Sequence, residues 1–518
     1  MGKQTVQNKK TKPSRMKKNQ ISRRSFLGRS ATATTALTVG TLLQPARSLF
    51  AQAARPGNPV QFPPDLRGDT LTAAPAEIEV WPGTRSSLLA LNGSVPAPTI
   101  RVRKGHRFHA HIKNRLAEDL VLHWHGILSP SDMDGNPRDA VGPGRSYSVD
   151  FPIRQRAGTY WYHAHTNLLT GKQVYLGLAG FFIVDDPDEH HLHLPREDHD
   201  LPLMIHDRRT HGEMHIAYEP EMLDIATGFL GDAVFVNNTP EAWLSVDRGL
   251  YRLRLLNGSN ARVLRLGLES ELAFKLIAND AGLLPEPVEV ETIMLAPGQR
   301  AEILLDFSNY AVGDTARLVS HPFDAGGGHG GHGGGGDMGG HIPPQGSELE
   351  VLTFYVDRAS GPSGRVPERL SRVRLYEPEH ARRMRVFELS VNGLVHPING
   401  ALFDLNRVDF TVRFGELEIW EYRNLSDELH PMHPHGALMQ VLERHGMDML
   451  PPEDTGWKDT VLMHPNETVR VLVRFQAYCG AYVHHCHNLE HEDNGMMQNL
   501  DVLRPRGHPG FDDRLDCE

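Results

Sequence analysis

Hydrophobic residues beyond about residue 54 occur in short runs rich in Val, Leu, Phe and Thr, which are separated by Gly, Pro and Asn. Few stretches show the spacing of an amphipathic helix. Short runs with turn residues at close intervals are typical of β-sandwich domains. The pattern therefore predicts an all-β fold. No run approaches the roughly 20 apolar residues that a membrane-spanning helix requires, so we expect no stable membrane insertion.

The body of the chain repeats itself three times. An Asn-containing turn opens each unit, at Asn92-Gly93, Asn237-Asn238 and Asn392-Gly393. A Pro-Gly or Pro-Asn turn later leads into a strand that ends in phenylalanine, from Pro143 to Phe151, Pro297 to Phe307 and Pro465 to Phe475. Such self-similarity indicates consecutive copies of one structural unit. We predict three domains, at residues 54–190, 191–375 and 376–518.

The first 53 residues differ from the body, because they contain eleven Lys/Arg and no Asp or Glu. Ser22-Arg23-Arg24-Ser25-Phe26-Leu27 precedes a mildly apolar segment, roughly Ala31 to Leu43, and then Ala51-Gln52-Ala53, an arrangement that signal peptidase accepts. The succession resembles a twin-arginine export signal, and the alternative is a basic arm with a chance arginine pair. The remaining residues carry 43 Lys/Arg against 64 Asp/Glu, a formal charge of −21 that argues against nucleic acid as a partner.

Four His-x-His pairs occupy matching places in the first and third units. They are His123/His125, His163/His165, His433/His435 and His485/His487. The middle unit lacks them at these places, so we expect it to act as a spacer. Residues two apart on a β-strand face the same side, so each pair presents two imidazoles together. The eight imidazoles can meet only where the first and third domains touch, and neutral imidazole suits Cu, Zn, Fe and Ni.

Cys486 lies between His485 and His487 and should therefore point to the opposite face of the strand. The nearby donors are His430, His491 and Met496. One thiolate, two imidazoles and a distant thioether form the trigonal site that is typical of blue copper. Zinc is the next metal to consider, but a structural zinc site uses four ligands and does not require ten histidines. Cys479 and Cys517 then remain, either as free thiols or as a disulfide.

These motifs, together with Gly456-Trp457-Lys458-Asp459-Thr460-Val461 and His491-Glu492-Asp493, give the chain its family likeness. From about residue 76 to 504 it resembles the three-domain multicopper oxidases, the family of laccases, bilirubin oxidases, spore-coat laccases and copper-efflux oxidases. The resemblance implies three consecutive cupredoxin-like Greek-key β-sandwiches and four copper ions. It assigns the type 1 ion to His430, Cys486, His491 and Met496, and the type 2 ion to His123 and His433. It assigns one type 3 ion to His125, His163 and His487, and the other to His165, His435 and His485.

Two carboxylates accompany the predicted ligands. Asp134 lies eleven residues after His123, and Glu492 directly follows His491. Reduction of dioxygen to water consumes protons, so acids are needed near the cluster. In similar oxidases, carboxylates at these two positions feed or orient those protons. The alternative for Asp134 is a turn residue before Gly135.

The resemblance implies an exported, periplasmic laccase-like oxidase whose partners are dioxygen, small aromatic reductants or metal ions, and the twin-arginine export machinery. Electrons would enter at the type 1 copper and pass through Cys486 to His485 and His487. An alternative is a copper-resistance protein that acts mainly as a cuprous oxidase or sequesters copper. Its best support is the segment 325–341, which contains eleven glycines and three histidines. A relative that has lost its copper and acts in cell division is a further alternative, against which the complete ligand set counts.

The substrate class follows from two positions before His430. Copper-efflux oxidases similar to this chain place Asp and Met there and use them to hold a cuprous ion, whereas this chain has Ser426 and Glu428. Soft Cu(I) prefers sulfur to the harder oxygen ligands. We therefore expect organic reductants to be preferred, with Glu428 accepting a hydrogen bond or proton from a phenol or amine. The alternative is that Glu428 is a solvated loop residue.

Overall fold

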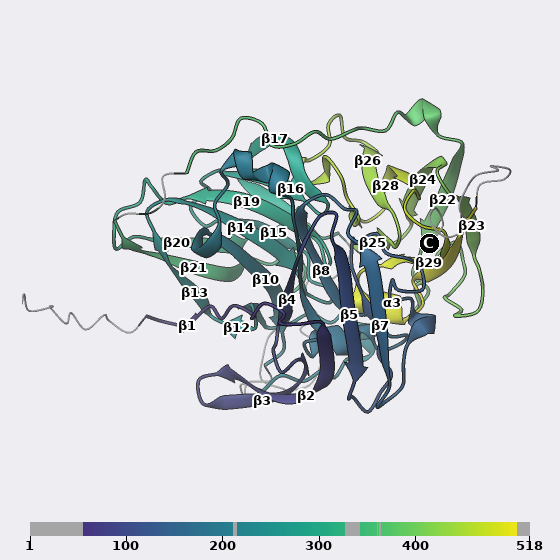
Figure 1. The fold of residues 1–518 in the computed structure, drawn as a ribbon, viewed down its shortest axis with the longest axis horizontal. Coiled ribbons are helices and arrows are strands. Elements are labelled where there is room, and N and C mark those ends of the chain that lie inside the picture. The colour runs from purple at the N-terminus through teal and green to yellow at the C-terminus, as the bar shows by residue number, and fades with distance from the viewer. Residues whose placement is uncertain (1–54, 211–214, 327–341, 360, 362–363, 505–518) are drawn as a thin grey trace, which may run out of the picture. The chain divides into compact units, whose positions relative to one another are not determined.

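The computed structural model describes residues 55–210, 215–326, 342–359, 361 and 364–504 (Figure 1). Strands dominate these residues and the helices are short, which confirms the predicted all-β class. Six sheets pair into three β-sandwiches, here called the first, middle and third sandwich in chain order. In the described part of the chain, no helix is long and apolar enough to cross a membrane. The predicted export signal at 1–53 lies outside the described residues, as do most of the segment 325–341 and Cys517; Cys479 is disulfide-bonded.

The first sandwich packs two four-stranded sheets around one apolar core. One sheet has the order β3 (Thr84–Leu91), β2 (Thr70–Trp81), β5 (Arg107–Asn114) and β7 (Ser146–Pro152). The other has the order β4 (Ala97–Arg103), β9 (Ala179–Asp185), β8 (Gly158–Ala164) and β6 (Leu122–His123). In β5, Phe108, Ala110 and Ile112 are buried while Arg107 and His109 are exposed. This alternation is expected of a sheet with one face toward water.

The middle sandwich is the largest and has a leucine-rich core. Its six-stranded sheet has the order β1 (Asn58–Pro59), β13 (Ala242–Asp247), β21 (Leu349–Arg358), β20 (Thr315–Ser320), β15 (Leu264–Leu268) and β18 (Thr292–Leu295). Its seven-stranded sheet has the order β12 (Thr239–Pro240), β11 (Ala233–Val236), β10 (Asp200–Arg208), β14 (Leu250–Asn257), β19 (Arg300–Asp306), β16 (Phe274–Asn279) and β17 (Gly282–Val290). Although β1 precedes the first sandwich in sequence, it pairs in parallel with β13, so the described chain begins on the middle sandwich.

The third sandwich carries Cys486 and half of the histidine pairs. Its four-stranded sheet has the order β22 (Arg383–Leu389), β24 (Leu417–Asn424), β28 (Thr468–Arg474) and β26 (Leu438–Arg444). Its five-stranded sheet has the order β23 (Phe410–Arg413), β30 (Met497–Leu503), β29 (Gly480–Cys486), β25 (His430–Pro434) and β27 (Val461–Met463). Trp420, Phe387 and Tyr422 pack in the core between the two sheets.

Short helices lie in the loops of the three sandwiches and in the links between them. The α-helices are α1 (Thr170–Tyr175), α2 (Met222–Thr227) and α3 (Leu489–Asp493). The 3₁₀ helices are η1 (Pro137–Asp139), η2 (Pro187–Leu192), η3 (Glu197–His199), η4 (Pro378–His380) and η5 (Pro452–Asp454). Strand β8 of the first sandwich contacts β17 and β19 of the middle one, η5 of the third contacts β16 and β18, and α1 contacts α3. Each sandwich therefore touches the other two, and β8 and α3, which carry or adjoin the predicted ligands, lie at these contacts.

Candidate metal centre

The four histidine pairs lie at strand ends rather than inside strands. His123, His163, His433 and His485 belong to β6, β8, β25 and β29, whereas the second histidine of each pair follows the end of its strand. In antiparallel register, His123 lies opposite His163 and His433 lies opposite His485. The first and third sandwiches therefore present the same arrangement, as the repeat predicted, and the two rings of each pair lie together as expected, with centroids 5.1–5.9 Å apart.

All eight imidazoles meet between the first and third sandwiches, and each of these residues is at most 1% exposed. We call this group the imidazole cluster. Rings from the two sandwiches stack, His123 on His435 with centroids 3.6 Å apart and His125 on His433 with centroids 3.8 Å apart. The Nε2 atoms of His123 and His433 are 3.4 Å apart, and those of His435 and His485 are 3.1 Å apart.

Hydrogen bonds fix which nitrogen of each ring faces its neighbours. His123 and His433 donate Nδ1–H to the carbonyls of Asp134 and Asp459, each at 2.7 Å. His435 donates Nδ1–H to Asp134 Oδ2, also at 2.7 Å. The Nε2 atoms that face one another are therefore lone-pair acceptors. Two acceptors at this separation repel unless a cation lies between them, so the arrangement fits a metal.

Other nitrogens of the imidazole cluster also indicate a metal site. Nδ1 of His125, Nε2 of His163 and both nitrogens of His487 are buried without a hydrogen-bond partner among the described residues. Such unpaired buried groups are uncommon in folded proteins. Burial lowers the pKa well below its ordinary value in His125, His163, His165, His433, His435 and His487. The rings are therefore neutral, which is the form that binds metals.

The structure brings together the ligand sets predicted for the type 2 and type 3 ions. His125, His163 and His487 form one group with nitrogen atoms within 4.8 Å of one another, and His165, His435 and His485 form another. His123 and His433 form a third group with His435. Donors consisting only of imidazole suit Cu, Zn, Fe and Ni, so these groups are compatible with copper.

Cys486 is a buried free thiol beside two further imidazoles. Its Sγ atom is 3.7 Å from His430 Nδ1 and 3.9 Å from His491 Nδ1. His430 donates Nε2–H to Ser426 Oγ at 2.9 Å, and His491 donates Nε2–H to the Ala226 carbonyl at 3.1 Å, so both Nδ1 lone pairs face the sulfur. Burial raises the pKa of the Cys486 thiol, an effect that a bound cation would oppose.

The fourth predicted ligand of this site is also buried nearby. Met496 lies in the same apolar core as Cys486, and its carbonyl accepts the Cys486 backbone N–H at 2.9 Å. We call His430, Cys486, His491 and Met496 the cysteine site. Its donor types are those of a blue copper centre.

Both predicted carboxylates contact the imidazole cluster. Besides its bond with His435, Asp134 accepts a hydrogen bond from Ser129 Oγ at 2.7 Å and is 1% exposed. Glu492 Oε2 lies 3.0 Å from His485 Nδ1, and its Oε1 lies 3.6 Å from His165 Nε2. Asp134 also precedes Gly135, which has φ of +89°, so it occupies a turn as well as contacting the cluster.

A cavity of about 140 Å³ adjoins the cysteine site. Glu428, Leu429 and Asn488 of the third sandwich line one side of it, and segments of the middle sandwich, among them α2 and residues 342–345, line the rest. Asn488 Nδ2 and Glu428 Oε2 lie 3.1 Å and 3.3 Å from His491 Nε2. Glu428 is only 8% exposed, so the alternative of a solvated loop residue is wrong.

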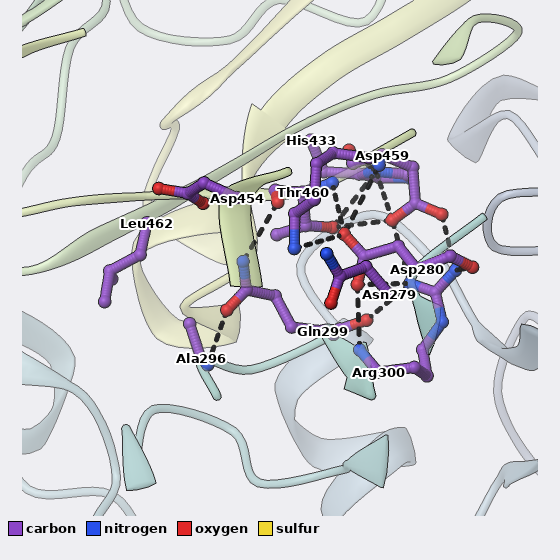
Figure 2. Close-up of polar contacts among 12 residues, drawn as sticks. Asn279, Asp280, Ala296, Gln299, Arg300, His433, Asp454, Asp459, Thr460 and Leu462 are labelled. Carbon is purple, nitrogen blue, oxygen red and sulfur yellow. Dashed lines mark hydrogen bonds and ion pairs between the residues drawn. The ribbon is translucent and has the colours of Figure 1, made fainter. Parts of the chain in front are cut away.

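Three contacts near the ligands had not been singled out in the sequence. His396 stacks on His491 with centroids 3.9 Å apart and donates Nε2–H to the Ala226 carbonyl at 2.9 Å. Arg300 and Asp459 form a buried ion pair beside the imidazole cluster (Figure 2). Asp459 lies within the motif Gly456–Val461, and Arg300 follows the Pro297 turn of the repeat, so the sequence contained a weak indication of both residues. It contained no indication of the isolated His396.

Comparisons with known proteins agree with this geometry. Family models described as multicopper oxidase match residues 72–189, 211–323 and 374–505. The laccase of Bacillus subtilis (strain 168) is 30% identical over 488 residues, covering 82% of this chain and 91% of that protein. The cell division protein FtsP of Escherichia coli (strain K12) is 34% identical over 497 residues, covering 93% of this chain and 98% of that protein.

The crystal structure of the McoA multicopper oxidase from the hyperthermophile Aquifex aeolicus matches with a TM-score of 0.77 and 37% identity, covering 86% of this chain and 99% of that chain. The match confirms the predicted fold of three cupredoxin-like β-sandwiches. The family implies copper as the metal, and the two buried donor sets fit it. The chain therefore belongs to the multicopper oxidase family and is an oxidoreductase of that family.

Proposed function

We propose that this multicopper oxidase is an exported laccase-like enzyme that couples one-electron oxidation of phenols and aromatic amines to reduction of dioxygen to water. The main support is that two buried donor sets, the cysteine site and the imidazole cluster, are joined through Cys486. The cysteine site would hold a type 1 ion, His123 and His433 a type 2 ion, and the other six imidazoles a type 3 pair. Bound copper supplies one-electron redox chemistry at the cysteine site and dioxygen reduction at the cluster.

The protein supplies a short connection between the two sites. Cys486 is bonded through the backbone to both His485 and His487, which belong to different type 3 ligand groups. His485 also donates Nδ1–H to the Cys486 carbonyl at 3.0 Å. An electron at Cys486 therefore reaches either ligand group without leaving the chain.

Asp134 and Glu492 are suited to deliver protons to the imidazole cluster, because their buried carboxylates contact its rings directly. Residues 130–133, which precede Asp134, line a cavity of about 790 Å³. Arg107 lines the same cavity and its side chain is 61% exposed, so water reaches this cavity. Asp134 therefore lies one residue from a water-accessible surface.

The cavity beside the cysteine site is suited to a small aromatic reductant. A phenol becomes far more acidic when it loses an electron, and Glu428 in the cavity wall is placed to accept its proton. Ser426 Oγ donates to Asn424 Oδ1 at 2.7 Å and accepts from His430 Nε2. Its hydroxyl is therefore used to orient the His430 ring, and it is poorly suited to bind a cuprous ion. These contacts favour an organic reductant.

A second candidate is a copper-resistance protein that oxidises or sequesters cuprous ion. Ala325, the first residue of the glycine- and histidine-rich segment, and Ile342, which follows it, line the cavity beside the cysteine site. Residues 327–341 themselves lie outside the described part. The similarity to FtsP raises a role in cell division as well, but the complete buried donor set favours an oxidase.

Replacing Cys486 by Ser should abolish the blue colour and reduce turnover to background. A serine oxygen provides neither the thiolate of a blue copper site nor its electron path. The measurements are the absorption spectrum and dioxygen consumption with a phenolic substrate, with copper content showing that the imidazole cluster stays loaded. A variant that keeps the intense blue absorption would contradict the assignment.

Replacing Glu428 by Gln should lower kcat/KM for a dimethoxyphenol by roughly tenfold or more, since a lost proton acceptor typically costs at least this much. Wild type should turn this phenol over without added copper and more efficiently than a stabilised cuprous salt. Glu443→Gln, on β26 and paired with Arg470, is the matched control and should behave as wild type. A strong wild-type preference for cuprous ion, or an unaffected Gln variant across the pH range, would overturn this assignment.

Replacing Arg23 and Arg24 together by Lys should trap the enzyme inside the cell, because a receptor-read signal requires more than positive charge. Activity in periplasmic and cytoplasmic fractions measures the outcome. The control converts Lys17 and Lys18 to Arg, which also keeps the charge and should leave export unchanged. Equal periplasmic activity in all three proteins would show that the signal is not of the twin-arginine type.

A further inference from the structure

The middle sandwich, which we expected to act as a spacer, sends one turn against the segment of the third sandwich that contains Asp459 and Thr460 (Figure 2). This turn spans residues 297–300. Gly298 has φ of +81°, and a Cβ atom there would lie 2.9 Å from the ring of His487, so only glycine allows this approach. Gln299 donates Nε2–H to the Thr460 carbonyl of the third sandwich at 3.0 Å. The turn therefore touches both the imidazole cluster and the segment beside it.

Arg300 ends this turn, and its side chain is 0% exposed. Its Nε–H donates to the Thr159 carbonyl in β8 of the first sandwich at 3.0 Å. Nη1 donates to the Gly298 carbonyl and Asp459 Oδ1, each at 2.8 Å. Nη2 donates to the Asp280 carbonyl at 2.8 Å and Asp459 Oδ2 at 2.5 Å. All five N–H groups of the guanidinium are thus used, on partners from all three sandwiches.

Asp459, which Arg300 holds in place, also forms hydrogen bonds with two predicted copper ligands. Its Oδ1 accepts Nε2–H from His125 of the first sandwich at 3.1 Å, and its carbonyl accepts Nδ1–H from His433 of the third at 2.7 Å. His125 must then face the cluster with Nδ1, the atom that has no hydrogen-bond partner among the described residues. His433 faces it with Nε2. One residue thereby sets the coordinating atom of a ring from each half of the cluster.

We propose that the Arg300–Asp459 pair is a positioning clamp by which the middle sandwich selects the tautomers of His125 and His433 and holds the two halves of the cluster in register. The proposal rests on the copper assignment made above. Lys458 and Asp280 complete the buried group, with Lys458 Nζ 2.9 Å from Asp280 Oδ2 and the Arg300 backbone N–H donating to Asp280 Oδ1 at 2.8 Å. Two cations thus face two carboxylates, which is the pairing that buried charges require.

The test separates this role from ordinary stabilisation by a buried ion pair. Asp459→Asn and Arg300→Lys alter the clamp, and Arg262→Lys is the matched control. Arg262 is equally buried in the middle sandwich, pairs with Asp207 at 2.8 Å, and makes its other hydrogen bonds to the carbonyls of Gly231 and Pro344. The Arg262→Lys substitution should lower the melting temperature without altering the imidazole cluster.

In the copper-loaded enzyme, both clamp variants should release cluster copper to a chelator at about 10- to 100-fold lower competing concentration. This is the usual loss when a residue that orients metal ligands is changed. The electron paramagnetic resonance signal of the type 2 ion should change as well. The blue absorption of the cysteine site and KM for the phenol should stay as in wild type, while kcat falls.

The clamp is refuted if both variants melt at lower temperature, as Arg262→Lys does, but keep wild-type copper affinity and the wild-type type 2 signal. Asp459→Asn preserves the shape of the side chain, so it decides the question if Arg300→Lys does not fold. A wild-type protein that binds no copper after loading would refute the proposed function instead, which keeps the two failures distinct.

Discussion

Eight imidazoles share one buried interface, and the rest of the structure depends on satisfying their hydrogen-bonding groups there. Each ring needs one nitrogen bonded to the protein and the other aimed at a shared point. Carbonyls of Asp134, Ala164, Asp459 and Cys486 each accept an Nδ1–H from one ring. These carbonyls lie at strand ends or in the loops near them, so the backbone of the first and third sandwiches sets the tautomers of half of the rings before a metal binds. Burial, which lowers the pKa of six of these rings, keeps them neutral and able to coordinate.

Asp134 and Asp459 occupy related places in the two halves of the cluster. Each gives its carbonyl to a histidine of its own sandwich and its carboxylate to a histidine of the other, His435 for Asp134 and His125 for Asp459. Their further partners differ. The Asp134 carboxylate accepts a hydrogen bond from a serine hydroxyl, and this residue lies next to a water-accessible cavity. The Asp459 carboxylate accepts hydrogen bonds from two N–H groups of Arg300. A bidentate guanidinium holds a carboxylate in one orientation. One aspartate is thus suited to proton transfer, and its counterpart to fixing geometry.

The sequence predicted those features that depend on residue type and on spacing within a strand or a repeat. The all-β class and the grouping of His430, Cys486 and His491 belong here, since ligand chemistry and repeat phase can both be read locally. The bond between Arg300 and Asp459 joins residues 159 positions apart, and no periodicity reports such a contact. The burial of Glu428 was hidden for the same reason, because its cavity is closed by α2 and other segments of the middle sandwich. The placement of the histidine pairs at strand ends depended on where each strand stops, which alternation does not specify.

The imidazole cluster and the cysteine site are held by different parts of the structure. Substrate choice can therefore change independently of the imidazole cluster. The imidazole cluster is held mainly by strand register and by one buried ion group. The cysteine site is closed over His491 by the Ala226 carbonyl and by His396, and the neighbouring cavity is lined mostly by segments of the middle sandwich. Such connecting segments vary more readily than the strands they join. Since His491 is 1% exposed, a reductant must approach it through these segments and through Glu428 and Asn488. Substitutions there can therefore change the reductant while every ligand of the imidazole cluster stays in place.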